Sequence, residues 1–114
     1  MLPNDHLLVY DNGTAHAKQE TRAVEYALDH QAHTATLVWE YRHTPAIYTS
    51  IMGYVQRLTN GNTVVSFSQA GVINEVSSAG QRLWEATVML DGVVVNTAFY
   101  RARRINSLYR YSPD

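Results

Sequence analysis

The sequence predicts an all-β chain of two antiparallel β-propeller-like blade repeats, followed by a C-terminal strand. Two Trp-Glu dipeptides, Trp39-Glu40 and Trp84-Glu85, carry tryptophans that lie 45 residues apart (84 − 39 = 45). Each dipeptide closes a stretch of short strand-like runs and turn signals, and no segment shows a convincing helical period. A period of about 40 to 50 residues that carries several short strands is typical of a propeller blade.

The first repeat spans about residues 2–41. Residues 7–10 are a short apolar run that ends near Asn12-Gly13, a turn signal because both residues tolerate positive φ. A polar loop follows over residues 14–21. Residues 22–29 place Val24, Tyr26 and Leu28 on one face by alternation, and residues 34–41 are rich in β-branched and aromatic types, so both segments are predicted as strands.

The second repeat spans about residues 53–95, after a connection over residues 42–52 that contains Pro45. Its turn signals are Asn60-Gly61 and Asp91-Gly92. Strands are expected over residues 54–58, 63–67, 71–77 and 82–89, with a further short one after Gly92. The closing segment, residues 96–111, is predicted as the C-terminal strand, and we expect residues 1–114 to form a single domain.

Composition excludes several classes of function. The net charge is −1, with 9 basic and 10 acidic residues, which argues against a nucleic-acid binder. The chain has no cysteine, so disulfides and thiolate chemistry are excluded. No apolar run approaches the ~20 residues of a membrane span, so no membrane partner is expected. The first residues lack a signal-peptide pattern, and the compartment is left open.

With the repeats laid out, the chain resembles the C-terminal part of the arylsulfotransferase family. The resemblance rests on short motifs that occur in the family's order. These motifs are Tyr10-Asp11-Asn12-Gly13, Arg22-Ala23-Val24-Glu25-Tyr26, Leu37-Val38-Trp39-Glu40-Tyr41, Gln56-Arg57-Leu58-Thr59-Asn60-Gly61-Asn62-Thr63, Glu75-Val76, Leu83-Trp84-Glu85 and Phe99-Tyr100-Arg101-Ala102. They cover nearly the whole chain and match only the last two blades and the tail of the family's propeller.

The resemblance implies a six-bladed β-propeller whose bacterial enzymes transfer a sulfuryl group between phenols through a covalent histidine intermediate, without a metal or a nucleotide donor. A family histidine lies upstream of the strand that ends at Gly13, and His6 is too close to that strand to match it. A late catalytic histidine would fall near residues 69–71, where this chain has none. The nucleophile cannot be carried over, so we expect no sulfotransferase activity from the isolated chain.

Four residues are predicted to bind a ligand: His16, Asn12, Arg101 and Arg103. The family pattern expects a cation shortly after Gly13, and His16 stands there. Arg101 lies in the motif shared with the family, and in an extended strand Arg101 and Arg103 share one face. Imidazole and guanidinium groups suit a small anionic or aromatic ligand. The alternatives are a solvated loop for His16, and arginines that pair with glutamates of neighbouring strands.

Several other residues are expected to be structural. Trp39 and Trp84 are predicted to be buried core aromatics. His30, His33 and His43 are predicted to be exposed turn residues, because their spacing fits no recognisable zinc site. Glu40 and Glu85 occupy equivalent repeat positions, so we expect a shared structural task at the strand edges. No metal and no cofactor are expected.

Two blades leave sheet faces and strand edges uncovered, so we expect the chain to self-associate. Three copies would supply six blades, and a strand-exchanged dimer is the other arrangement considered. The favoured function is a non-catalytic binding or assembly module, which could hold a small anionic or aryl ligand. The alternatives are a sulfotransferase-type enzyme active only as an assembled oligomer, and a structural remnant without a ligand.

Overall fold

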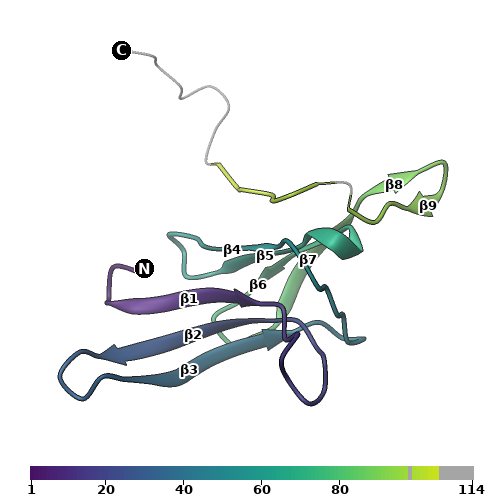
Figure 1. The fold of residues 1–114 in the computed structure, drawn as a ribbon. Coiled ribbons are helices and arrows are strands. Elements are labelled where there is room, and N and C mark those ends of the chain that lie inside the picture. Colours follow the sequence, from purple (N-terminus) through teal and green to yellow (C-terminus); the bar gives the residue numbers. More distant parts are fainter. Residues whose placement is uncertain (98, 106–114) are drawn as a thin grey trace, which may run out of the picture.

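The computed structural model describes residues 1–97 and 99–105, and it folds into two antiparallel sheets and a small hairpin (Figure 1). The first sheet has the order β1-β2-β3, with β1 at His6–Asp11, β2 at Arg22–Asp29 and β3 at Thr34–Arg42. The second sheet has the order β4-β5-β6-β7, with β4 at Tyr54–Arg57, β5 at Thr63–Phe67, β6 at Val72–Val76 and β7 at Arg82–Thr87. A short 3₁₀ turn, η1 at Ser68–Ala70, joins β5 to β6, and β8 at Met89–Leu90 pairs with β9 at Val93–Val94. The predicted all-β class with blade-like repeats is confirmed.

The tight turns fall where the sequence predicts them. Gly61 has φ 88° in the turn between β4 and β5, and Asp91 and Gly92 have φ 50° and 79° between β8 and β9. Asn12-Gly13 instead opens a long loop. Gly13 has φ 73°, and a Cβ there would lie 2.1 Å from the carbonyl oxygen of Glu20, so this loop requires glycine on both conformational and steric grounds.

The two sheets repeat one another residue by residue. In the first sheet Glu25 pairs with Trp39, and a register shift follows between Glu25 and Tyr26. In the second sheet Glu75 pairs with Trp84, and the same shift follows between Glu75 and Val76. A bulge at the same place in both sheets means that β1, β2 and β3 correspond to β5, β6 and β7. The repeat inferred from the two tryptophans therefore extends to backbone geometry.

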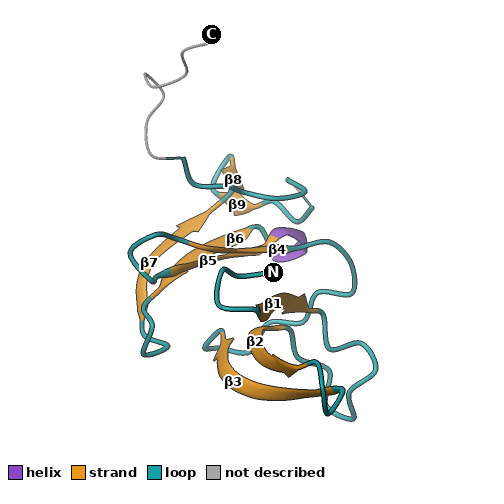
Figure 2. Ribbon diagram, turned by 90° about the vertical axis from the view of Figure 1, so that its left-hand side faces the viewer, coloured by secondary structure: helices purple, strands orange, loops and turns teal. Residues whose placement is uncertain are grey.

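The core lies between the inner faces of the two sheets, which lie one above the other in Figure 2. Its buried members are Ala23, Tyr41, Val65, Phe67 and Val76. The ring of Phe67 meets the rings of Tyr10 and Tyr41 at centroid distances of 5.9 and 6.4 Å. Successive side chains of a strand point to opposite faces of the sheet, so the neighbours of these core residues lie on the outer face of each sheet, away from the core.

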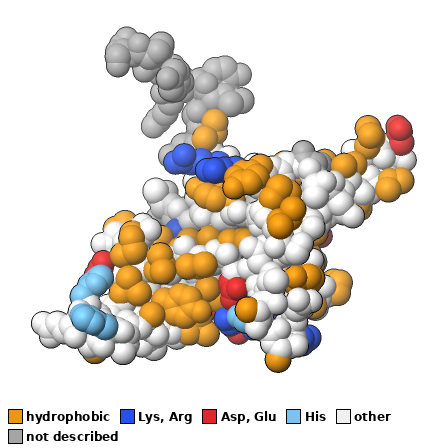
Figure 3. Space-filling view, viewed as in Figure 1, with side chains coloured by type: hydrophobic (Ala, Val, Ile, Leu, Met, Phe, Trp, Pro, Cys, Tyr) orange, Lys and Arg blue, Asp and Glu red, His pale blue; other side chains and the backbone are white. Residues whose placement is uncertain are grey.

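The outer face of the first sheet is apolar over the half nearer the turn between β2 and β3, and its other end carries the charged residues Asp11, Arg22, Glu40 and Arg42. Leu7, Tyr26 and Leu37 are paired in register across β1, β2 and β3, and they lie on the side of the sheet opposite to the core residue Ala23. Leu37 is 44% exposed. Figure 3 shows hydrophobic side chains gathered over these three strands.

The outer face of the second sheet is covered only in part. Residues 100–104 run along it, where their main chain bonds to the side chains of Gln56, Ser66 and Ser68. The prediction that Trp84 is buried is wrong, because this side chain is 54% exposed beside the segment. Of the predicted C-terminal strand, residues 96, 97 and 99–105 are not part of a strand, while residues 98 and 106–111 lie outside the described residues.

Within the described part of the chain, no helix has the length and apolar character needed to cross a membrane.

Candidate functional site

The predicted ligand residue Asn12 serves the packing of the chain on itself. Its side-chain amide donates hydrogen bonds to the carbonyl oxygens of Thr49 (2.7 Å) and Met52 (3.1 Å). Thr49 is fully buried, and its hydroxyl also bonds to the hydroxyl of Tyr10 at 2.7 Å. Burial raises the pKa of Tyr10 to about 12, so this hydroxyl stays protonated. These hydrogen bonds hold the connection between the sheets, at Thr49 and Met52, against the end of β1.

His16 lies beside a carboxylate. Its Nε2 is 3.4 Å from Oδ2 of Asp11, and Nε of Arg22 donates to the same oxygen at 3.0 Å. Burial raises the pKa of Asp11, but the hydrogen bonds from Arg22 and the amide of Gly13, together with the charges of His16 and Arg22, outweigh it and hold this pKa below its usual value. An anion at His16 would therefore meet the negative charge of Asp11, which disfavours anion binding there.

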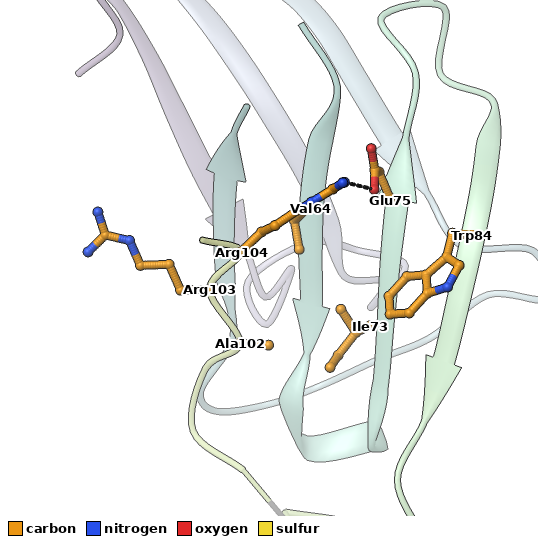
Figure 4. Close-up of a pocket in the computed structure, with 7 residues that line it drawn as sticks. All are labelled: Val64, Ile73, Glu75, Trp84, Ala102, Arg103 and Arg104. Carbon is orange, nitrogen blue, oxygen red and sulfur yellow. Dashed lines mark hydrogen bonds and ion pairs between the residues drawn. The ribbon is translucent and has the colours of Figure 1, made fainter. Parts of the chain in front are cut away.

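The three described arginines of the tail have three different environments. Arg101 lies over the rings of Tyr54 and Tyr100, at 5.2 and 5.4 Å from their centroids. Arg104 forms an ion pair with Glu75, as predicted for arginines that meet glutamates of neighbouring strands. Arg103 is exposed and points away from Glu75 and Trp84 (Figure 4). All three side chains are exposed, and Arg103 is the one of these three that makes neither an ion pair nor a ring contact with a described residue.

A groove of about 460 Å³ lies between the tail and strands β5, β6 and β7 on the outer face of the second sheet (Figure 4). Its lining residues are Val64, Ile73, Glu75, Trp84, Ala102, Arg103 and Arg104. Neither His16 nor Asn12 lines it, so the four predicted ligand residues do not meet in this cavity. Their ligand role stays a prediction. Trp84 was predicted as a core residue and not as a groove residue, because its local sequence matches that of the repeat-equivalent Trp39.

The interface between the two sheets contains residues equivalent to those of the groove, but there they are covered by the second sheet. On the inner face of the first sheet, Glu25 accepts a hydrogen bond from Arg57 of β4 at 2.5 Å, and Arg57 lies 5.5 Å from the centroid of the Trp39 ring. On the outer face of the second sheet, the repeat-equivalent Glu75 pairs with Arg104, beside the equivalent Trp84. The same acid, arginine and tryptophan therefore occur twice, once inside an interface and once at the surface.

Glu25 is a deeply placed carboxylate at the interface between the sheets. It also receives a 2.6 Å contact from Nδ1 of His6, and its side chain is only 8% exposed. Burial raises the pKa of Glu25, but the hydrogen bonds and the charges of His6 and Arg57 together outweigh it and hold this pKa below its usual value. The carboxylate therefore stays ionised and joins β1, β2 and β4.

The expectation that His43 is an exposed turn residue is wrong. Its side chain is 7% exposed, its Nε2 lies 2.7 Å from Glu85, and its Nδ1 lies 2.7 Å from the carbonyl oxygen of Pro45. The hydrogen bond from His43, together with one from Asn74, holds the pKa of Glu85 below its usual value. His43 also packs edge-on against Phe67. It is buried because the connection turns inward across the core.

The two glutamates after the tryptophans share a structural task, as expected. Glu40 accepts a hydrogen bond from Arg22 at 2.9 Å, and Glu85 accepts one from Arg82 at 3.0 Å. Each thus pairs with an arginine of its own sheet, on the central strand β2 in the first sheet and on the edge strand β7 in the second.

The described residues bring together no group of three or more histidine, cysteine, aspartate or glutamate side chains placed to hold a metal ion. Near residues 69–71, where the family resemblance implies a histidine, Gln69 accepts a hydrogen bond from the main chain of Ser50 at 2.7 Å.

Comparison with known proteins agrees with the motif pattern. A search of curated proteins and a search of solved structures found no match. The family model described as arylsulfotransferase (ASST) matches residues 1–110 of the 114. This chain, with its two bulged sheets that each carry a Trp-Glu pair, therefore belongs to the arylsulfotransferase family.

Proposed function

We propose that this chain is a non-catalytic, β-propeller-like assembly module, a pair of blades that packs head to tail with further copies of itself. The observation that carries the proposal is the repeated unit of glutamate, arginine and tryptophan. In its first occurrence, at Glu25, a following sheet covers it. In its second occurrence, at Glu75, the groove beside Trp84 takes the place of that sheet.

The outer faces of the two sheets, which no other sheet covers, correspond by sequence repeat to the two inner faces that pack against each other inside the chain. The outer face of the second sheet corresponds, by register, to the inner face of the first sheet. The outer face of the first sheet likewise corresponds to the inner face of the second. A second copy could therefore lay its first sheet on the outer face of the second sheet of its neighbour, as the second sheet of the chain lies on the first.

The exposed apolar surface favours such packing. Besides Leu37 and Trp84, the β8–β9 hairpin exposes Met89, Leu90, Val93 and Val94. Apolar side chains gathered in this way are typical of protein interaction surfaces. A head-to-tail contact forms a ring when its rotation closes, and three copies would supply six sheets, the number implied by the family resemblance. A strand-exchanged dimer is the alternative assembly.

The oligomeric state in solution tests the proposal. Sedimentation equilibrium at several loading concentrations should give a mass above that of one chain, and three chains is the expected mass. Leu37→Lys places a charge on the outer face of the first sheet and should lower the measured mass towards one chain. Gln31→Lys adds the same charge in the exposed turn between β2 and β3 and should leave the mass unchanged. A folded monomer at micromolar concentration would refute the assembly.

A second candidate function is the binding of a small anionic or aromatic ligand in the groove. It is favoured by the half-exposed ring of Trp84 and by the guanidinium of Arg104, which lies on Glu75 at the same cavity (Figure 4). A thermal-shift titration with 4-nitrophenyl sulfate tests it, with Arg104→Ala as the variant that should bind less and Arg103→Ala, whose side chain points away from the groove, as the control. A ligand at 100 times its dissociation constant should stabilise the fold by about 2.7 kcal/mol.

The remaining alternative, an enzyme active only when assembled, is tested with the same compound. Transfer of sulfate from 4-nitrophenyl sulfate to phenol releases coloured nitrophenol. Turnover by the oligomer that is lost in His16→Ala would favour this alternative over the assembly module.

A further inference from the structure

The first sheet has a free edge at β1. In the equivalent second sheet, a fourth strand, β4, occupies this edge. The turn over residues 2–6 reproduces the turn over residues 58–62. The amide of Leu2 donates to the carbonyl of His6 at 2.8 Å, as that of Leu58 donates to Asn62 at 2.8 Å. In the second sheet this turn is preceded by β4, which pairs with β5. Among the described residues, no strand occupies the corresponding edge of β1.

The tail lies against the second sheet in the same way that β4 lies against the first sheet. Arg57 of β4 reaches back to Glu25 of the preceding sheet, and Arg104 of the tail reaches back to the equivalent Glu75. Counting from these two arginines, residues 101–104 correspond to residues 54–57. Val55 packs against the core between the sheets, and the corresponding Ala102 faces the second sheet in the groove. Main-chain position and side-chain direction therefore agree.

The main chain of the tail has one side occupied and one side open. The amide and carbonyl of Ala102 bond to the hydroxyl of Ser66 (both 3.2 Å), and those of Arg104 bond to the side chain of Gln56 (2.9 and 3.2 Å). The hydrogen bonds among the described residues include none from the main chain of Arg101 or Arg103. Alternate residues of an extended chain point their main-chain groups to opposite sides, so these two residues present an unpaired strand edge.

The free edge of β1 presents the matching groups. His6 already uses its carbonyl on that side, for the turn to Leu2. Because direction alternates along a strand, the main-chain groups of Leu8 and Tyr10 point to the same free side. In the second sheet the corresponding residues, Val64 and Ser66, are paired with Gln56 and Tyr54 of β4. The register of the missing pairing follows directly from this correspondence.

We propose that residues 101–104 of one copy add to the first sheet of the next copy as an antiparallel strand along β1, with Arg101 opposite Tyr10 and Arg103 opposite Leu8. The inference rests on the proposed head-to-tail assembly. A chain cannot supply this strand to itself, because its tail lies on the outer face of the second sheet while β1 belongs to the first (Figure 1). Each copy thereby completes a four-stranded blade in its neighbour.

Cysteine trapping tests the register. In the proposed pairing Ala102 lies opposite Val9 in a non-hydrogen-bonded pair, where the Cα atoms are about 4.5 Å apart, within the range of a disulfide. The chain has no cysteine of its own. We would mix a Val9→Cys chain with an Ala102→Cys chain of different tag length and oxidise them. A disulfide-linked pair containing one chain of each kind is the expected product. Arg103→Cys in place of Ala102→Cys is the matched control, because the neighbouring side chain points to the opposite side of the strand and should not form this link.

Amide hydrogen exchange of the unmodified chain gives a second readout that does not depend on substitution. The amides of Leu8 and Tyr10 should exchange slowly in the oligomer and lose their protection when dilution dissociates it. An oligomer with rapid exchange at both amides and no link between positions 9 and 102 would overturn strand addition and leave the assembly standing. A monomer by sedimentation would instead overturn the assembly itself, and the strand addition with it.

Discussion

Replacement of Trp84 by alanine should weaken association between subunits while leaving each subunit folded. Trp84 is 54% exposed in the single chain. An aromatic side chain of this size presents roughly 150–250 Å², so on the order of 100 Å² of it is in contact with water. Covering about 100 Å² at roughly 25 cal/mol per Å² stabilises a subunit contact by about 2.5 kcal/mol. Trp84→Ala should therefore lower the association constant of each contact roughly 70-fold.

Sedimentation equilibrium of the unmodified chain and of Trp84→Ala, over the same range of concentrations, measures this change. Urea unfolding of both chains, followed by circular dichroism at a concentration where both are dissociated, measures the stability of the subunit itself. We expect a large shift in association and a small shift in unfolding, because the alanine removes a side chain that packs little within its own subunit.

The repeat-equivalent Trp39 provides the matched comparison. It packs against the core and lies under Arg57, so Trp39→Ala should cost about 3 kcal/mol of unfolding free energy, as large-to-small core substitutions do. Equal association constants for the unmodified chain and Trp84→Ala would refute the reasoning, since they would mean that no neighbour covers this side chain.

Three further predictions concern the subunit. Because the pKa of Glu25 is lowered by its partners, its contribution to stability is fully present above the usual value near 4.5 and is lost as the pH falls through the lowered value. Unfolding measured over a range of acid pH should show this loss of stability. Glu25→Gln, which cannot titrate, should lack this part of the pH dependence. Gly13→Ala should destabilise by more than Gly61→Ala in urea unfolding. Both have positive φ, costing roughly 1–2 kcal/mol, but a Cβ meets Glu20 at the first and nothing within 4 Å at the second; equal losses would contradict the steric part. Phe67→Ala should cost about 3–5 kcal/mol, and Phe67→Leu clearly less, because Phe67 is fully buried among three rings; a loss below about 1 kcal/mol for the alanine would be inconsistent with this core.

The strands and turns were predictable because local chemistry specifies them. The alternation of Val24 and Tyr26 specifies β2, and Asn60-Gly61 specifies the turn after β4. These signals act over a few residues, so they survive without knowledge of the fold. The repeat between Trp39 and Trp84 also appears in sequence, because equivalent positions carry equivalent residues.

The environment of individual side chains was harder to predict. His43 looked like a turn residue, yet the connection carries it to Glu85 and the edge of Phe67. Asn12 looked like a ligand residue, yet its amide is used by Thr49 and Met52. These partners lie 24 to 42 residues away in the chain (67 − 43 = 24 for Phe67), and no local pattern indicates which distant groups a polar side chain will meet.

The sequence by itself determined that the chain is all-β, that it repeats, and that it belongs with the arylsulfotransferases, because periodicity and turn chemistry are written in neighbouring residues. Only the tertiary structure decided which copy of each repeated residue is covered. Trp39 and Glu25 lie under a following sheet, whereas Trp84 and Glu75 meet a short tail. Burial depends on the next layer of structure, which no residue specifies locally.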